Sequence, residues 1–128
     1  MSNTLSSELL QGFWLDGRLV EPLKGQVTSE SGTKHLAPKA VEVLLYLAKM
    51  PGSLVTHDVL LREVWGTGNG SHQALSRAVS EIRQAFDDHY DDPRVIRTVP
   101  RRGYCLLLEP SLDRASPGAD RNAGQEER

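Results

Sequence analysis

The sequence predicts an α+β fold in which an antiparallel β-sheet comes first, three helices follow, and a β-hairpin comes last. Apolar residues recur first in short pieces between turn dipeptides, then at helical spacing, and finally in two β-rich runs. The chain of 128 residues suffices for one hydrophobic core of ordinary size. We therefore expect one domain over residues 12–108, between a flexible N-terminus at 1–11 and a disordered linker or tail at 109–128.

The N-terminal sheet is predicted from short apolar pieces that alternate with turn dipeptides such as Asp16-Gly17 and Ser31-Gly32. The pieces are Phe13-Trp14-Leu15, Arg18-Leu19-Val20, Gln26-Val27-Thr28 and Lys34-His35-Leu36. Strands this short and this closely spaced pair in antiparallel order through tight turns. We therefore expect a small antiparallel meander in this part of the chain.

Three helices are predicted after the sheet. Pro38 suits the first turn of a helix, and Pro51-Gly52 ends that helix. Thr56 is an N-cap for a second helix, which stops at the glycine-rich segment 66–70. Ser71 caps the third helix, whose outer face is polar. The apolar residues of the third helix follow one narrow stripe at helical spacing: Leu75, Val79, Ile82 and Phe86.

Two β-rich runs, at 95–99 and 104–108, end the predicted domain. Pro100-Arg101-Arg102-Gly103 lies between them, and this sequence predicts a hairpin whose turn carries two cations. Ser53-Leu54-Val55 is a short extended piece between the first two helices. We expect it to pair with the hairpin as a third strand.

Separate motifs follow one another along this pattern: Leu36-Ala37-Pro38-Lys39, Val43-Leu44-Leu45, Pro51-Gly52-Ser53-Leu54-Val55-Thr56, Leu60-Leu61-Arg62-Glu63-Val64-Trp65-Gly66 and Val99-Pro100-Arg101-Arg102-Gly103-Tyr104. Together they resemble the OmpR/PhoB-type winged-helix DNA-binding domain, and within that family they are most similar to the CadC-like membrane-integrated regulators. The resemblance covers residues 12–108. It implies a winged helix-turn-helix fold with the hairpin as the wing. It also implies sequence-specific binding of double-stranded DNA as the output domain of a bacterial transcription regulator.

The third helix is the predicted recognition helix, because an amphipathic helix packed through one stripe leaves its other face free to enter a major groove. Its candidate DNA-binding residues are His72, Gln73, Ser76, Arg77, Ser80 and Arg83. Gln favours adenine and Arg favours guanine where two hydrogen bonds form, so Gln73 and Arg77 suit base recognition. Arg83 is expected to contact a phosphate. Glu81 is left out, because it either accepts from a cytosine or pairs with Arg77 at i, i+4.

The candidate DNA-binding residues of the wing are Arg97, Thr98, Arg101 and Arg102. A narrow A·T-rich minor groove attracts guanidinium groups, so we expect Arg101 and Arg102 to enter the adjacent minor groove. Arg97 and Thr98 are expected to contact backbone phosphate. The resemblance further implies a second copy of the domain on a neighbouring half-site. RNA polymerase is another implied partner, through the loop 66–70, which is short, glycine-rich and uncharged in this sequence.

The net charge of −2 argues by itself against a nucleic-acid partner, but the charges are unevenly distributed. Residues 1–33 carry two basic and four acidic groups, and residues 109–128 carry three basic and five acidic groups. Four arginines follow Asp92 before the next acid, Glu109. We therefore expect a local basic surface with modest non-specific affinity, whose occupancy of DNA depends on paired copies or on local concentration near a membrane.

Two other functions compete with DNA binding. The first is a protein–protein interaction module in which the third helix docks a partner. The second is a metal-dependent enzyme that uses the acidic loop Asp87–Asp92. A calcium loop would need glycine at its sixth position and glutamate where Thr98 stands, so we interpret the loop as a solvated turn. The four histidines show no metal-ligand spacing, and Cys105 is the single cysteine. We expect no enzyme activity, no metal, no cofactor and no small-molecule substrate.

The sequence also predicts a location. The start of the chain lacks the pattern of a signal peptide, and no apolar run approaches the roughly 20 residues of a membrane span, so we expect a cytoplasmic domain. Because Met1 lies shortly before the sheet, we expect no phosphoacceptor receiver domain upstream. The linker-like composition after Pro110 suggests a further region downstream, either a membrane span with a periplasmic sensor or a soluble repeat domain.

Overall fold

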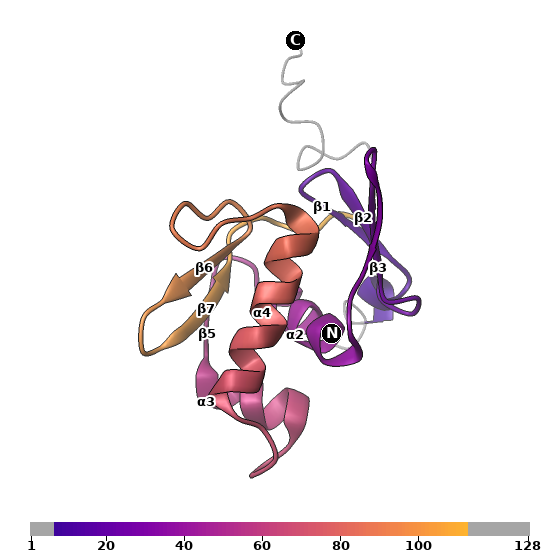
Figure 1. Cartoon of the computed structure of the whole chain (residues 1–128). Helices are drawn as coiled ribbons and strands as arrows, with labels where there is room; N and C mark the ends of the chain where they lie inside the picture. Colours follow the sequence, from indigo (N-terminus) through magenta and orange to yellow (C-terminus); the bar gives the residue numbers. More distant parts are fainter. Residues whose placement is uncertain (1–6, 113–128) are drawn as a thin grey trace.

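Two antiparallel sheets lie on either side of a group of helices in the computed structural model, which describes residues 7–112 (Figure 1). The N-terminal sheet contains β1 (Phe13–Leu15), β2 (Arg18–Glu21), β3 (Gln26–Ser29) and β4 (Gly32–His35). The helical elements are α2 (Pro38–Ala48), α3 (His57–Leu60), the π-helical turn η1 (Leu61–Trp65) and α4 (His72–Phe86). The second sheet contains β5 (Leu54–Thr56), β6 (Ile96–Val99) and β7 (Gly103–Leu106). This arrangement confirms the predicted α+β fold.

The N-terminal sheet is the predicted meander, with strand order β1-β2-β3-β4. Phe13 pairs with Val20, which in turn pairs with Val27, so these side chains share one face of the sheet. All three side chains are buried. The two-residue turn between β1 and β2 requires positive φ at both central positions, and Asp16 and Gly17 adopt φ values of 54° and 72°.

The helices begin at the predicted caps. Ser71 Oγ accepts a hydrogen bond from the Ala74 N–H at 3.0 Å, and Thr56 Oγ1 accepts from the Val59 N–H at 3.2 Å. The predicted second helix differs in detail, because α3 is followed by the π-helical turn η1, in which the Gly66 N–H donates to Leu61 O. Apolar spacing alone did not predict this wider turn.

The core lies between α2, α4 and the inner faces of the two sheets (Figure 1). Every residue of the predicted α4 stripe is 1% exposed or less: Leu75, Val79, Ile82 and Phe86. Burial of a large apolar side chain stabilises the fold by about 1.5–3 kcal/mol. The stripe therefore fixes which face of α4 points outward, and that face carries five of the six DNA-binding residues predicted for the helix.

The wing hairpin, β6 and β7, forms a three-stranded sheet with β5 in the order β5-β7-β6, as predicted for the strand after α2. Thr56 pairs with Gly103 at the end of β5. A Cβ atom added at Gly103 would lie 2.0 Å from Val55 O and 2.8 Å from the Thr56 Cα. Only glycine therefore allows β5 to approach β7 this closely.

Both ends of the packed domain extend beyond the predicted boundaries. Residues 7–10 are helical, and Leu9 is 1% exposed within the core. At the other end, Ser111 and Trp14 exchange two backbone hydrogen bonds, with N···O distances of 2.6 and 2.9 Å. The expected flexible N-terminus at 1–11 and tail from residue 109 thus include ordered residues, whereas residues 1–6 and 113–128 lie outside the described part. No helix within residues 7–112 is long and apolar enough to cross a membrane.

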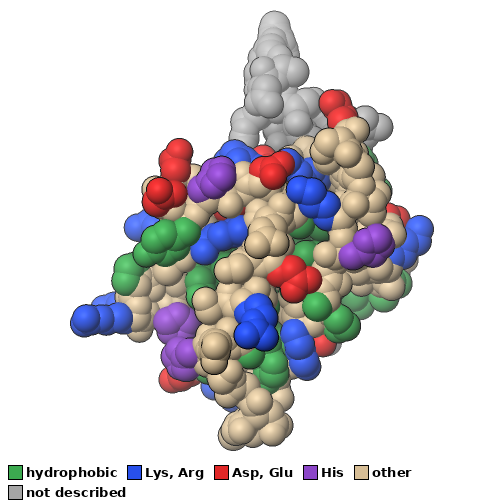
Figure 2. All heavy atoms as spheres, in the orientation of Figure 1, with side chains coloured by type: hydrophobic (Ala, Val, Ile, Leu, Met, Phe, Trp, Pro, Cys, Tyr) green, Lys and Arg blue, Asp and Glu red, His purple; other side chains and the backbone are tan. Residues whose placement is uncertain are grey.

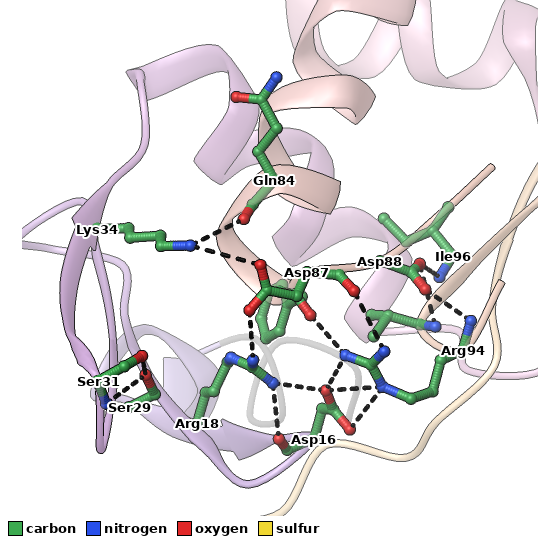
Figure 3. A network of polar contacts seen from close by, with 12 residues as sticks. Asp16, Arg18, Ser29, Ser31, Lys34, Gln84, Asp87, Asp88, Arg94 and Ile96 are labelled. Atoms are coloured by element: carbon green, nitrogen blue, oxygen red, sulfur yellow. Dashed lines mark hydrogen bonds and ion pairs between the residues drawn. The ribbon is translucent and has the colours of Figure 1, made fainter.

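Asp88 anchors the segment between α4 and β6, which the sequence predicted to be a solvated turn (Figure 3). Its side chain is buried and accepts backbone hydrogen bonds from Arg94, Val95 and Ile96 at 2.6, 3.1 and 2.9 Å. Asp91 and Asp92 of the same segment are exposed, as a solvated turn requires. The carboxylate of Asp88 therefore fixes the start of β6 relative to the end of α4.

An ion-pair network joins this segment to the N-terminal sheet (Figure 3). Asp16 pairs with Arg18 at 2.7 Å and with Arg94 at 2.6 Å, and the hydrogen bond that Arg94 donates to Asp16 raises the pKa of Arg94. Asp87 pairs with Arg18 at 3.3 Å and with Lys34 at 3.7 Å. Asp87 at the end of α4 therefore neutralises cations of the N-terminal sheet, and Asp16 of that sheet neutralises Arg94 of the loop after α4.

Asp88→Asn is expected to lower the free energy of unfolding by about 2–3 kcal/mol. Asparagine keeps one acceptor oxygen but turns an N–H donor toward backbone N–H groups that now donate to the carboxylate. Urea unfolding followed by circular dichroism measures the change, with the exposed Asp91→Asn as the control, which should shift stability by no more than about 0.5 kcal/mol. Equal effects of the two substitutions would contradict the anchoring role of Asp88.

Candidate nucleic-acid interface

The outer face of α4 presents the predicted polar stripe to solvent. Its exposed residues are His72, Gln73, Ser76, Arg77, Ser80 and Gln84. Because α4 turns about 100° per residue, Gln73, Arg77 and Ser80 lie above one another on one side of the helix. Five of the six residues predicted for the recognition helix are therefore accessible, and the sixth is Arg83.

Arg83 does not lie on the exposed face of α4. It is 9% exposed, and its Nη2 donates to Ile96 O and to Thr98 Oγ1, both at 2.8 Å. Position 83 follows Ile82 of the buried stripe and therefore faces β6 rather than solvent. The expected phosphate contact of Arg83 is incompatible with this geometry, in which the side chain connects α4 to the wing.

Glu81 makes a different contact from either of the two expected. Its Oε2 accepts a hydrogen bond from the Ala37 N–H at 2.6 Å, at the residue that precedes α2. The carboxylate therefore connects α4 to the start of α2.

Within the part of the chain that the structure describes, Arg77 has no ion-pair partner, so its guanidinium is available to a ligand.

The predicted wing residues divide between two faces of the hairpin. Arg97 is exposed, whereas Thr98 is half-buried and bonded to Arg83, because successive residues of a strand point to opposite sides. Thr98 therefore positions the wing instead of facing a phosphate freely. Arg101 and Arg102 are exposed at the turn, where Arg101 has a φ of 67°. The Arg102 carbonyl accepts from the His57 N–H at 2.9 Å, which holds the turn against the start of α3.

The exposed cations on two sides of the molecule differ in whether they form ion pairs. The cations that pair with acids lie on the N-terminal sheet, on α2, on η1 and in the loop after α4: Arg18, Lys24, Lys34, Lys39, Arg62 and Arg94. The exposed arginines of α4 and the wing form no ion pair within residues 7–112: Arg77, Arg97, Arg101 and Arg102. Figure 2 shows cations at the wing tip, while acidic side chains gather at the loop after α4.

The structure brings together two histidines that the sequence placed on separate helices. The rings of His57 and His72 lie 4.9 Å apart, edge to face, and the ring of Tyr104 lies 5.6 Å from His57. Burial lowers the pKa of His57, as does the nearby His72, while Asp58 opposes this shift. Burial also raises the pKa of Tyr104. The sequence holds one sign that both histidines lie at helix starts, because each directly follows an N-cap residue, Thr56 or Ser71.

These histidines line an open pocket of about 380 Å³ between the start of α4 and the wing tip. Its lining residues are Leu54, Thr56, His57, Asp58, His72, Arg101 and Arg102. Among residues 7–112, no group of three histidine, cysteine, aspartate or glutamate side chains is arranged to hold a metal ion. The side chains that line the pocket include two imidazoles, two guanidinium groups, a hydroxyl and a carboxylate.

The chain is similar in sequence to known transcriptional regulators. The family model described as "Transcriptional regulatory protein, C terminal" matches residues 31–106. The transcriptional activator CadC of Escherichia coli (strain K12) is 30% identical over 91 residues, which are 70% of this chain and 18% of CadC. The alkaline phosphatase synthesis transcriptional regulatory protein PhoP of Bacillus subtilis (strain 168) is 33% identical over 80 residues, which are 62% of this chain and 33% of PhoP.

Solved structures share the fold. The DNA-binding domain of E. coli CadC aligns with a TM-score of 0.67 and 27% identity, covering 77% of this chain and 94% of that domain. The DNA-binding domain of Klebsiella pneumoniae RstA, solved in complex with the RstA box, aligns with a TM-score of 0.63 and 24% identity, covering 76% of this chain and 97% of that one. These matches confirm the predicted winged-helix fold and the predicted likeness to CadC. Because the family model matches more than half of the chain, the chain belongs to the OmpR/PhoB-type family of transcriptional regulatory protein C-terminal domains.

Proposed function

We propose that this domain binds double-stranded DNA sequence-specifically, as the output domain of a bacterial transcription regulator. The observation that carries the proposal is the position of the exposed arginines without an ion pair in the described part of the chain. All four lie on the outer face of α4 or on the wing. Cations without an acidic partner release condensed counterions when they neutralise phosphates, and this release is a large part of the affinity for DNA.

The two exposed elements suit two grooves. In the proposed complex α4 enters the major groove, where Gln73 and Arg77 match the hydrogen-bonding edges of adenine and guanine. Ser76 and Ser80 flank Arg77 on the same face and complete the base-reading surface. Arg101 and Arg102 enter the adjacent minor groove from the wing tip, and Arg97 contacts phosphate.

The proteins to which this chain is similar are transcriptional regulators, and this supports the proposal. A solved structure with 27% identity to this chain is the DNA-binding domain of CadC. The chain spans 18% of CadC and 33% of PhoP. We propose that the domain acts, like the matched parts of these proteins, as one part of a regulator. We place it in the cytoplasm, where bacterial DNA is accessible, and propose a second copy on a neighbouring half-site. RNA polymerase is a further proposed partner, through the exposed residues 67–69 after η1.

The proposed role is binding without catalysis, metal or cofactor. The side chains on the proposed interface are hydrogen-bond donors and cations, and Asp58 is the acid that lines its pocket. A docking surface for another protein is the competing function, and the first of the following experiments separates it from DNA binding.

DNA affinity is expected to fall steeply with salt. The four arginines that the proposed complex brings to the DNA neutralise about four backbone charges, which gives a slope of about −3 to −4 for log K against log[KCl]. Fluorescence anisotropy with a short labelled duplex between about 50 and 200 mM KCl measures this slope. Replacing Arg101 and Arg102 together by alanine should reduce its magnitude by about 2. The matched control is Arg62→Ala, an exposed arginine paired with Glu63 on η1, which should leave the slope unchanged. Absence of binding, or a flat slope, would favour a protein-docking surface.

Arg77→Ala is expected to relax base preference at one position of the binding site. The loss of a bidentate contact to guanine removes about 1–3 kcal/mol of discrimination. Selection from a pool of randomised duplexes, carried out with both proteins, reveals the preferred sequence of each. Arg97→Ala is the matched loss of one exposed arginine, and it should weaken binding to all sequences alike. If the Arg77 variant kept the base preference of the wild type, the result would contradict the proposed position of α4 in the major groove.

Arg83→Leu is expected to act through stability instead of through a lost phosphate contact. The Ile96 carbonyl and the Thr98 hydroxyl would lose their donor, which costs about 1–3 kcal/mol in the free energy of unfolding. Urea unfolding measures this loss, and anisotropy at several salt concentrations measures the slope, which should stay within error of the wild type. A slope reduced by about 1 with unchanged stability would instead make Arg83 a phosphate ligand.

A further inference from the structure

Three elements meet at the pocket between the wing tip and the start of α4. His57 begins α3, His72 begins α4, and Arg101 and Arg102 form the wing turn. Figure 2 shows two histidine side chains side by side, between the cations of the wing tip and the lower end of α4. The backbone hydrogen bond from His57 to Arg102 holds two of these elements together at 2.9 Å. Four basic side chains therefore surround one open pocket.

The groups that face His57 come from each of these elements. His72 faces it from α4, Tyr104 from β7, and Arg101 and Arg102 across the pocket from the wing turn. Asp58, on the same helix as His57, is the acid of the lining. If both imidazoles were protonated, four cations would surround the pocket with one carboxylate. An anion in the pocket would relieve their mutual repulsion.

We propose that this pocket binds one backbone phosphate of DNA, and that its binding is coupled to proton uptake at His57, whose ring lies against His72. The inference rests on the proposed function and adds a regulated contact to it. The phosphate is one of those that flank the minor groove entered by Arg101 and Arg102. A phosphodiester is a compact oxyanion with several acceptor positions, and these suit an imidazolium N–H beside the two guanidinium groups of the wing turn. Leu54 is the apolar side chain of a lining that otherwise consists of polar and charged groups.

The direction of the coupling follows from the charges. In the free domain, burial and the nearby His72 hold the pKa of His57 below its ordinary value of 6.5. A bound phosphate would raise the pKa of His57, because the negative charge favours the imidazolium form. A pKa that is higher in the complex than in the free domain means that protonation strengthens binding. Affinity therefore rises as the pH falls through the pKa of the complex, and levels off below the pKa of the free domain.

Anisotropy titrations of a short duplex of arbitrary sequence, at constant ionic strength, test this coupling. Between about pH 8 and pH 5 the affinity of the wild type should rise by about threefold to tenfold. In the double variant His57→Gln/His72→Gln the change should be less than about twofold. His35→Gln is the matched control, because His35 is exposed on β4 and does not line the pocket. Thermal unfolding at each pH confirms that every variant stays folded.

Imidazole NMR gives a readout that is independent of affinity. The pKa of His57 should be higher in the DNA complex than in the free domain. DNA binding with the same affinity at every pH, or a pH dependence that survives in the double variant, overturns the phosphate pocket and leaves the proposed function standing. Absence of DNA binding at every pH and at low salt overturns both. An unchanged pKa of His57 in the complex also rejects the coupling.

Discussion

The buried guanidinium of Arg83 sets the angle between the recognition helix and the wing. It projects from the edge of the α4 stripe, donates to Ile96 and Thr98 of β6, and lies 5.7 Å from the ring centroid of Tyr90. Its Nε–H has no hydrogen-bond partner in the described residues, so part of the desolvation cost of the guanidinium is not recovered. A neutral side chain would avoid that cost. What the arginine provides is a fixed attachment between two elements that, in the proposed complex, reach two adjacent grooves at once.

The acids of the domain support the same geometry from the other side. Asp88 holds the start of β6 through three backbone N–H groups, and Glu81 connects α4 to the residue before α2. Asp16 and Asp87 neutralise cations between the N-terminal sheet and the end of α4. These acids make structural contacts away from the exposed face of α4. A net charge of −2 is therefore compatible with a cationic interface, because net charge does not report which cations are already paired.

Periodicity and local turn chemistry predicted most of the fold. The α4 stripe, the caps at Thr56 and Ser71, and the hairpin around Arg101 each depend on near neighbours in the sequence, so their pattern is visible there. The exposed face of α4 followed from the same stripe. The resemblance to a known family supplied what spacing alone did not, namely the roles of that face and of the wing.

The residues that were predicted incorrectly are those whose role depends on distant parts of the chain. Arg83 has a polar side chain at the edge of an apolar stripe, and only the position of β6 decides whether it faces solvent or strand. Glu81 bonds to a residue 44 positions away, and Asp88 looks like any acid in an acidic loop. The contact between His57 and His72 requires two helix starts to converge, which no local pattern records.

The arrangement of α4 separates the two kinds of DNA contact along one helix. His72 lies in the first turn beside the wing tip, whereas Arg77 lies in the second turn on the outer face. A phosphate held in the histidine pocket presents the same chemistry at every sequence, so protonation there changes affinity for all DNA alike. The proposed base recognition by Arg77 depends on the rotation of α4, which Arg83 and the buried stripe fix independently of the histidines. Proton uptake at the pocket would therefore change how tightly the domain binds without changing which sequence it prefers.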